Sequence, residues 1–179
     1  MFEGKLYESG VKVFDEQEAQ EIHEDFYYGK FLDSGELHLS PSEAMHLHDR
    51  EELEVQYGDE ILGRSELFER LSRVDDEFEY KYAAYSDLRE RGLIVKSGFK
   101  FGAHFRVYER GTNPYKDGPK EQSDHTKYVV HAVPENHTLS FQEMSRAVRL
   151  AHNIRAKMLW AVVDSEEGVT YYEVEHTNL

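Results

Sequence analysis

The sequence predicts two consecutive domains: an α+β domain over residues 1–77 and an α/β domain over residues 78–179 with a mixed central sheet. One observation is that the period of the apolar residues changes from that of helices to that of strands after Gly92. The other is charge. Residues 1–80 hold 7 Lys and Arg against 23 Asp and Glu, a net charge of −16, whereas residues 81–179 hold 14 against 13. This asymmetry is a first indication of function, because the average charge of the chain conceals a half that is not acidic.

Short elements are predicted for the beginning of the chain. We expect a hairpin over residues 5–14, a turn at residues 28–29 and a strand over residues 36–39. A helix should then begin at Ser40, because a proline follows this N-cap and Glu43 completes a capping box.

Two further helices precede the change of period. One is expected to begin near Ser65, and it places on one face Leu67, Leu71 and Val74. The next ends at Gly92 as its C-terminal cap, and the apolar residues at helical spacing in it are Phe78, Tyr82, Tyr85 and Leu88.

The remaining chain alternates strands with one helix. Strands are expected over residues 93–95, 99–108, 128–133, 158–163 and 169–174, with Gly98 and Gly102 as turn or bulge positions. A second capping box, Ser140 with Glu143, begins a helix that runs to about Arg155. The polar segment GTNPYKDGPKEQSD, residues 111–124, is expected to be a long exposed loop.

Several classes of protein are excluded by what the sequence lacks. Without cysteine there are no disulfides, thiolate metal sites or cysteine nucleophiles. No P-loop, dinucleotide-binding glycine motif or nucleophile elbow is present. His46 and His48 diverge on a helix, which favours exposed polar residues over a metal site. No apolar run approaches the roughly 20 residues that a bilayer requires. We therefore expect a cytoplasmic protein without metal or cofactor.

The segment of residues 98–110 mixes aromatic rings with Lys100, Arg106 and Arg110. Rings stack on unpaired bases and guanidinium groups bind phosphate, so this composition suits RNA. The alternative is an ordinary sheet with aromatic residues inside and cations outside. In the same way, a second group of cations is either RNA-binding or a solvated helix face: Arg146, Arg149, Arg155 and Lys157.

These motifs and their order resemble the archaeal tRNA-splicing endonucleases. The segments that carry the resemblance are YAAYSDLRERGLIVKSGFKFG (82–102), FRVY (105–108), HTKYVV (125–130) and VRLAHNIR (148–155), with weaker matches at YG (28–29) and LHLSPSEA (37–44). The resemblance implies a restriction-endonuclease-like catalytic domain and metal-independent excision of introns from precursor tRNA at bulge-helix-bulge sites. In that reaction a 2′-hydroxyl attacks the adjacent phosphate and leaves 2′,3′-cyclic phosphate and 5′-hydroxyl ends.

The resemblance also implies roles for two residues. Tyr108 matches the general base and His125 matches the general acid. Histidine titrates near neutrality and can deliver a proton to the leaving oxygen. A tyrosine ordinarily ionises only near pH 10, so a phenol needs nearby cations to act as a base. The alternative is that Tyr108 orients the 2′-hydroxyl by a hydrogen bond.

One departure from the family pattern concerns catalysis. Where the family has Arg followed directly by a catalytic Lys, this chain has Arg155 followed by Ala156, and its lysine is Lys157. A step of one residue reverses the face of a strand. We hypothesise that cleavage is impaired; the rival is a local shift that lets Lys157 serve.

Further expectations concern RNA and assembly. Arg149 matches an arginine that clamps a flipped base, and the acidic turn of Asp164, Glu166 and Glu167 matches a loop that docks into another subunit. The resemblance implies a homotetramer, or a dimer if the chain is part of a two-repeat protein. The alternative to an active enzyme is a noncatalytic RNA-binding or structural subunit. A metal-dependent DNA nuclease is more remote, because no cluster of two carboxylates and a lysine is recognisable.

Overall fold

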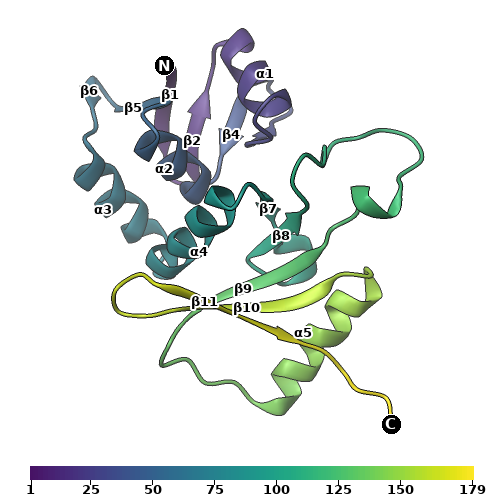
Figure 1. Ribbon diagram of the computed structural model, residues 1–179. Coiled ribbons are helices and arrows are strands. Elements are labelled where there is room, and N and C mark those ends of the chain that lie inside the picture. Colours follow the sequence, from purple (N-terminus) through teal and green to yellow (C-terminus); the bar gives the residue numbers. More distant parts are fainter. The chain divides into compact units, whose positions relative to one another are not determined.

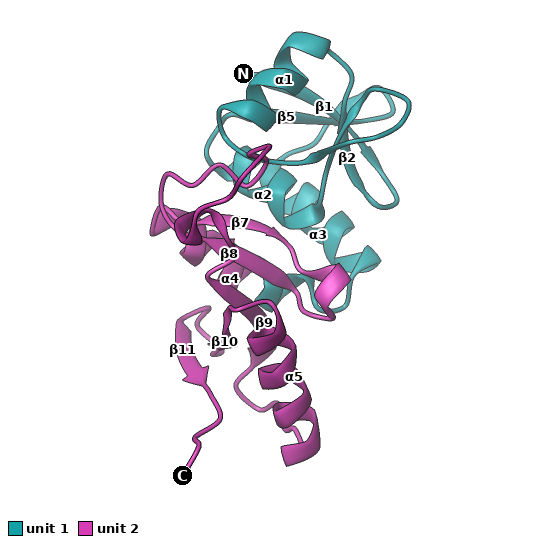
Figure 2. Ribbon diagram, turned by 90° about the vertical axis from the view of Figure 1, so that its right-hand side faces the viewer, with its two compact units in different colours: residues 1–82 teal, residues 83–179 magenta.

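The computed structural model describes all residues, 1–179, and divides them into two compact units, Met1–Tyr82 and Ala83–Leu179 (Figure 2). The division lies within helix α4 (Phe78–Glu90), near the expected boundary. Each unit contains its own mixed sheet with helices against it, as the sequence predicts. No helix in either unit has the length and apolar character needed to cross a membrane.

The N-terminal unit is built on a six-stranded sheet of order β3-β4-β2-β1-β5-β6. Its strands are β1 (Phe2–Tyr7), β2 (Gly10–Val13), β3 (Lys30–Phe31), β4 (Leu37–Leu39), β5 (Leu53–Tyr57) and β6 (Glu60–Ile61). The β1–β2 hairpin and β4 confirm two predicted elements. The β1–β5 pair is parallel and the other pairs are antiparallel.

Helix α2 (Pro41–Asp49) begins at the predicted capping box. The side chain of Ser40 accepts from the backbone N–H of Glu43, whose carboxylate accepts in return from the backbone N–H of Ser40. The other carboxylate oxygen of Glu43 accepts from the N–H of Gly29 at 2.9 Å. Gly29 has a φ of +68°, and a Cβ there would lie 2.9 Å from the carbonyl oxygen of His38. One buried glutamate therefore joins the turn to the helix.

Three expectations for the N-terminal unit need correction. Helix α1 (Glu16–Glu24) is not among the predicted elements, although Asp15 caps it. On α3 (Arg64–Val74), Leu67 and Leu71 are buried, but Val74 is 56% exposed because it ends the helix. His46 is buried beside Tyr28, not exposed on the surface.

The C-terminal unit contains a five-stranded sheet of order β11-β10-β9-β8-β7. Its strands are β7 (Ile94–Ser97), β8 (Phe105–Tyr108), β9 (Tyr128–Pro134), β10 (Lys157–Val163) and β11 (Val169–Val174). The β9–β10 pair is parallel and the others are antiparallel, which confirms the mixed sheet. Helix α5 (Phe141–Asn153) begins at the predicted capping box of Ser140 and Glu143 and lies along the sheet (Figure 1).

The two faces of this sheet are covered by different helices. Val129 and Met158 pack with Val148 and Ala151 of α5, and we call this side the α5 face. On the other side, the α4 face, the ring of Tyr85 lies 5.7 Å from that of Phe105. Because side chains alternate along a strand, each residue of β8, β9 and β10 can be assigned to one face.

The predicted strand over residues 99–108 is wrong in its first half. Residues Phe99–Phe101 form a 3₁₀ turn, η1, which ends at Gly102 with a φ of 64°. The backbone atoms of Ala103 and Phe105 lie so near Gly98 that a Cβ there would approach them to 2.9 Å. The loop that follows β8 contains a second 3₁₀ turn, η2 (Gln122–Asp124), and an ion pair of 2.6 Å between Lys116 and Asp124.

Candidate functional site

Tyr108 and His125 lie at the same end of the C-terminal sheet. Tyr108 is the last residue of β8, and His125 precedes β9, the antiparallel neighbour of β8. The N–H of Lys127 donates to the carbonyl oxygen of Val107 at 2.8 Å, which brings the approach to β9 against the end of β8. The side chain of His125 is exposed, whereas Tyr108 is 6% exposed with no protein partner for its hydroxyl.

Two cations share the face on which Tyr108 lies. Arg106 is paired with Val129 in the sheet, which places Arg106 and Tyr108 on the α5 face. The guanidinium carbon of Arg106 is 6.0 Å from the ring centroid of Tyr108. Lys96 is paired with Arg106 and is 8% exposed, with Nζ 5.1 Å from the ring centroid of Tyr115. The segment thus does not follow the simple pattern of aromatic residues inside and cations outside, since the strand residue Lys96 is buried and Phe99 in the η1 turn is 88% exposed.

Ala156 belongs to the same face as Tyr108. The chain leaves α5 through Arg155, whose φ is 58°, and the N–H of Ala156 then donates to the carbonyl oxygen of Ala151 at 2.9 Å. Ala156 packs against the cluster beneath α5, on the same side as Met158. The register places it two strands from Tyr108, a spacing of about 10 Å. A methyl group at this position cannot reach the space beside Tyr108.

Lys157 lies on the opposite, α4 face. It is the first residue of β10 and is paired with Tyr128, and its Nζ donates to Glu173 at 2.7 Å. This hydrogen bond raises the pKa of Lys157 above its ordinary value. Lys127 also pairs with a carboxylate, that of Glu109, and its Nζ lies 5.1 Å from the ring centroid of Tyr128. Lys157 is therefore paired with a carboxylate on the α4 face, and Lys127 is paired with Glu109, the residue that follows Tyr108.

The residues predicted to bind RNA are separated along the unit. Lys100 is exposed in η1, and Arg149 is exposed on α5. Ala156 lines a groove of about 830 Å³ at the end of α5, which the Lys157–Glu173 pair also borders. Its other lining residues include His152, Met158, Val174 and His176.

The acidic turn between β10 and β11 has two kinds of carboxylate. One oxygen of Asp164 accepts from the N–H of Glu166 at 2.8 Å and from that of Gly168 at 2.9 Å, so this side chain shapes its own turn. Glu166 and Glu167 are exposed, and Glu167 has a φ of 64°. All three side chains are exposed, but the carboxylate of Asp164 is engaged within the turn, whereas those of Glu166 and Glu167 are not.

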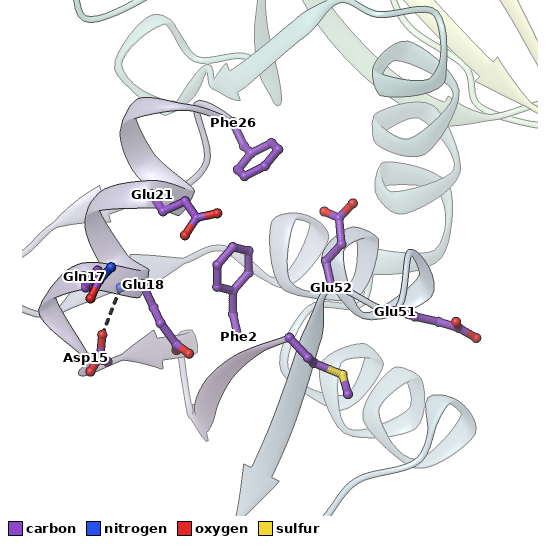
Figure 3. A pocket seen from close by; sticks show the side chains of 9 residues that line it. Phe2, Asp15, Gln17, Glu18, Glu21, Phe26, Glu51 and Glu52 are labelled. Atoms are coloured by element: carbon purple, nitrogen blue, oxygen red, sulfur yellow. Dashed lines mark hydrogen bonds between the residues drawn. The ribbon is translucent and has the colours of Figure 1, made fainter.

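The N-terminal unit contains a hollow of about 640 Å³ that is lined by acidic side chains, in contrast to the cations near Tyr108. Carboxylates of Glu18, Glu21 and Glu52 lie around the ring of Phe2, and Asp15 and Glu51 complete its acidic lining (Figure 3). Such a surface repels a polyanion. No group of three or more histidine, aspartate or glutamate side chains in the structure could hold a metal ion.

Two family models match consecutive parts of the sequence. Residues 2–68 match the N-terminal domain of tRNA intron endonucleases, and residues 78–171 match the catalytic C-terminal domain. The chain belongs to the tRNA intron endonuclease family. Tyr108, His125 and Ala156 all lie within the part that matches the catalytic domain.

Similar proteins fall into two groups, one of about the same length as this chain and one about twice as long. The tRNA-splicing endonuclease of Thermococcus kodakarensis is 42% identical over 173 residues, which are 95% of this chain and 96% of that protein. That of Thermococcus onnurineus is 40% identical over 169 residues, 93% of this chain and 92% of that protein. The tRNA-splicing endonuclease of Methanococcoides burtonii is 36% identical over 168 residues, which are only 46% of its length.

The sequence analysis did not predict that Lys96 lies on the same face of the sheet as Arg106 and Tyr108. Its signal was available in the alternation along Ile94–Ser97, but a buried lysine is assigned to a face only when the register with β8 is known. The partners of Lys127 and Lys157 were missed for the same reason. Glu109 and Glu173 are 18 and 16 residues away from them in the sequence.

Proposed function

We propose that this protein is a tRNA-splicing endonuclease that cuts precursor tRNA at bulge-helix-bulge sites, without metal, through a restriction-endonuclease-like catalytic domain. The observation that carries the proposal is the placement of Tyr108 and His125 at one end of two neighbouring strands, inside a region that matches the family's catalytic domain. Membership of the family and the tRNA-splicing endonucleases among its relatives support the choice of substrate.

The reaction needs two proton transfers around one phosphate. The 2′-oxygen forms a bond to phosphorus while the bond from phosphorus to the 5′-oxygen breaks, giving a 2′,3′-cyclic phosphate and a 5′-hydroxyl. His125 gives its proton to the leaving 5′-oxygen, the general-acid role that histidine most often fills in enzymes. Tyr108 holds the 2′-hydroxyl through its own hydroxyl, which no protein group occupies. As the general base, Tyr108 accepts the 2′ proton; if it only orients the 2′-hydroxyl, the proton passes to another acceptor.

The third element of the family's site is weakened in this chain. A positive charge beside the phosphate stabilises the negative charge that develops on its oxygens. At the matching position stands Ala156, and Lys157 lies on the other face of the sheet with Glu173. We therefore propose that cleavage is impaired relative to a chain with lysine at position 156.

Two cut sites in each substrate require two catalytic units at a fixed separation, which a symmetric oligomer supplies. We propose a homotetramer for a chain of this length, and a dimer if it belongs to a two-repeat protein. Relatives of similar and of double length support both forms. Exposed Glu166 and Glu167 of the acidic turn would supply the docking charge, and Arg149, Arg106 and Lys100 would contact RNA.

A second function, a noncatalytic subunit of the same enzyme, is favoured by one observation, the methyl group at position 156. It leaves the presence of Tyr108 and His125 at the same end of the sheet without a purpose. The two functions differ in whether this chain alone cuts RNA, so a rate measurement separates them.

The test is incubation of the full chain with an intron-containing precursor tRNA in EDTA, in parallel with Ala156→Lys. We expect slow cleavage by the natural chain, with 2′,3′-cyclic phosphate ends, and an increase of up to about 10²-fold in Ala156→Lys. Products that require added Mg²⁺, or no cleavage by either protein, would contradict the proposed function. Binding of the RNA without cleavage by either chain would favour the noncatalytic subunit.

A further inference from the structure

The α5 face carries a guanidinium group whose charge no protein carboxylate neutralises. Arg106 donates through Nε to the carbonyl oxygen of Ser97 at 2.9 Å, and this is its only hydrogen bond in the structure. An arginine has five N–H donors, so the four on its two terminal nitrogens remain for a ligand. Its carbon lies 5.4 Å from the ring centroid of Phe101 and 6.0 Å from that of Tyr108. The group is therefore held between two rings and already oriented.

The position of Arg106 suits a phosphate next to Tyr108. The two residues are next-but-one neighbours on β8, about 7 Å apart at the backbone, on the face that Ala156 shares. A guanidinium fork binds two oxygens of a phosphate at once. Lys96, paired opposite Arg106 on β7, adds a second positive charge on the same face.

Two lysines near this end of the sheet are bound to carboxylates. Lys157 is bound to Glu173 on the α4 face, and Lys127, which the register places beside Tyr108, is bound to Glu109. Arg106 has no such partner. Among the cations of these strands, it is the one that combines the correct face, a fixed orientation and unoccupied donors.

We infer that Arg106 supplies the positive charge that stabilises the reacting phosphate in this protein, in place of the lysine that Ala156 replaces. Its terminal N–H groups bind the two non-bridging oxygens as the bond from the 2′-oxygen to phosphorus forms and the bond to the 5′-oxygen breaks. Arg106 transfers no proton. The inference rests on the proposed function, and it gives Arg106, expected from the sequence only to bind RNA, a catalytic role.

The test compares Arg106→Gln and Arg106→Lys in the natural chain and in the Ala156→Lys background, with precursor tRNA in EDTA. In the natural chain, Arg106→Gln should lower kcat about 10²-fold. KM should change less than about threefold, since the contact strengthens in the transition state. Arg106→Lys should retain intermediate activity. In the Ala156→Lys background, Arg106→Gln should cost less than about tenfold, because the two cations serve one phosphate.

Lys120→Gln is the matched control, because it removes one exposed loop cation without a partner and should leave the rate unchanged. Thermal unfolding shows whether Arg106→Gln is folded. If it is not, the same comparison is made with Arg106→Lys.

Three outcomes would overturn the inference. The first is a rate for Arg106→Gln within about threefold of that of the natural chain. The second is an equal loss in both backgrounds, which indicates a structural role. The third is an inactive natural chain that Ala156→Lys activates. If neither the natural chain nor Ala156→Lys cleaves, the proposed function itself fails, and the role of Arg106 fails with it.

Discussion

The two faces of the C-terminal sheet differ in whether their charged side chains have partners of opposite charge. On the α4 face, Lys157 is paired with Glu173, and Asp87 accepts hydrogen bonds from Arg91 and from the hydroxyl of Tyr171. On the α5 face, the guanidinium of Arg106 lies beside Tyr108 without a carboxylate. Paired charges hold elements together, whereas an unpaired, oriented charge is available to a ligand. Under the proposed function, we expect the α4 face to serve stability and the α5 face to serve the reaction.

The comparison also supports the expectation that Lys157 does not serve in place of a lysine at position 156. Ala156 and Lys157 are neighbours in sequence, but the alternation of β10 sends their side chains to opposite faces. The ion pair with Glu173 then stabilises the charged form of Lys157 where it is. Moving it to the α5 face would require breaking that pair and shifting the strand by one residue.

Removal of the predicted general acid should have the largest effect. We expect His125→Ala to lower kcat on precursor tRNA by about 10²–10⁴-fold, because the leaving 5′-oxygen then departs without a proton. A substrate with a better leaving group than the 5′-oxygen should restore much of the loss. Loss without such recovery would mean that His125 holds RNA and donates no proton, and would remove this residue from the chemistry.

A charge on the α4 face should affect stability and not the chemical step. We expect Asp87→Asn to lower the free energy of unfolding by about 1 kcal/mol at pH 7, because the hydrogen bonds from Tyr171 and Arg91 lose a charged acceptor in a partly buried site. The kcat of the folded variant should match that of the natural chain. A large fall in kcat at unchanged stability would break the division between the faces.

The loss of stability in Asp87→Asn should depend on pH and become smaller in acid. Burial raises the pKa of Asp87, but hydrogen bonds from Arg91 and Tyr171 outweigh it and hold the pKa below its ordinary 3.8. The stabilisation is therefore complete above that value and is lost as the pH falls through the lower, folded-state pKa. Urea unfolding at several pH values should show the difference between Asp87→Asn and the natural chain shrinking below about pH 4.

The smallest effect is expected for Lys157→Ala. The side chain is exposed and its pair with Glu173 lies at the surface, so stability should change by less than about 1 kcal/mol. Cleavage should also stay within about threefold, because the charge lies on the wrong face. A loss of 10²-fold or more, measured under single-turnover conditions, would instead identify Lys157 as the catalytic cation.

Local signals made much of the fold predictable. The capping boxes of Ser40 with Glu43 and Ser140 with Glu143 are complete within four residues, so both helix starts follow from the sequence. The strand predicted over residues 99–108 failed because a left-handed Gly102 ends a 3₁₀ turn there, and the alternation of aromatic residues concealed it. Helix α1 was missed although Asp15 accepts from the N–H of Glu18, because few apolar residues follow.

The candidate site was predictable only in part. Tyr108, His125 and Ala156 could be identified as candidate site positions, because each lies in a short segment that resembles the family. The surroundings of Arg106 depend on pairing between β7, β8 and β9, which is long-range and sets the face of each side chain. Ion pairs such as Lys157 with Glu173 depend on the same register, so sequence alone could not show which cations are already occupied.

The division of the sheet into two faces is tested most directly by exchanging the residues at 156 and 157. The double variant Ala156→Lys with Lys157→Ala keeps the composition and net charge of the chain and moves one lysine from the α4 face to the α5 face. Single-turnover cleavage of an intron-containing precursor tRNA in EDTA should become at least about tenfold faster than with the natural chain. A rate equal to or below that of the natural chain, from a folded double variant, would contradict the account.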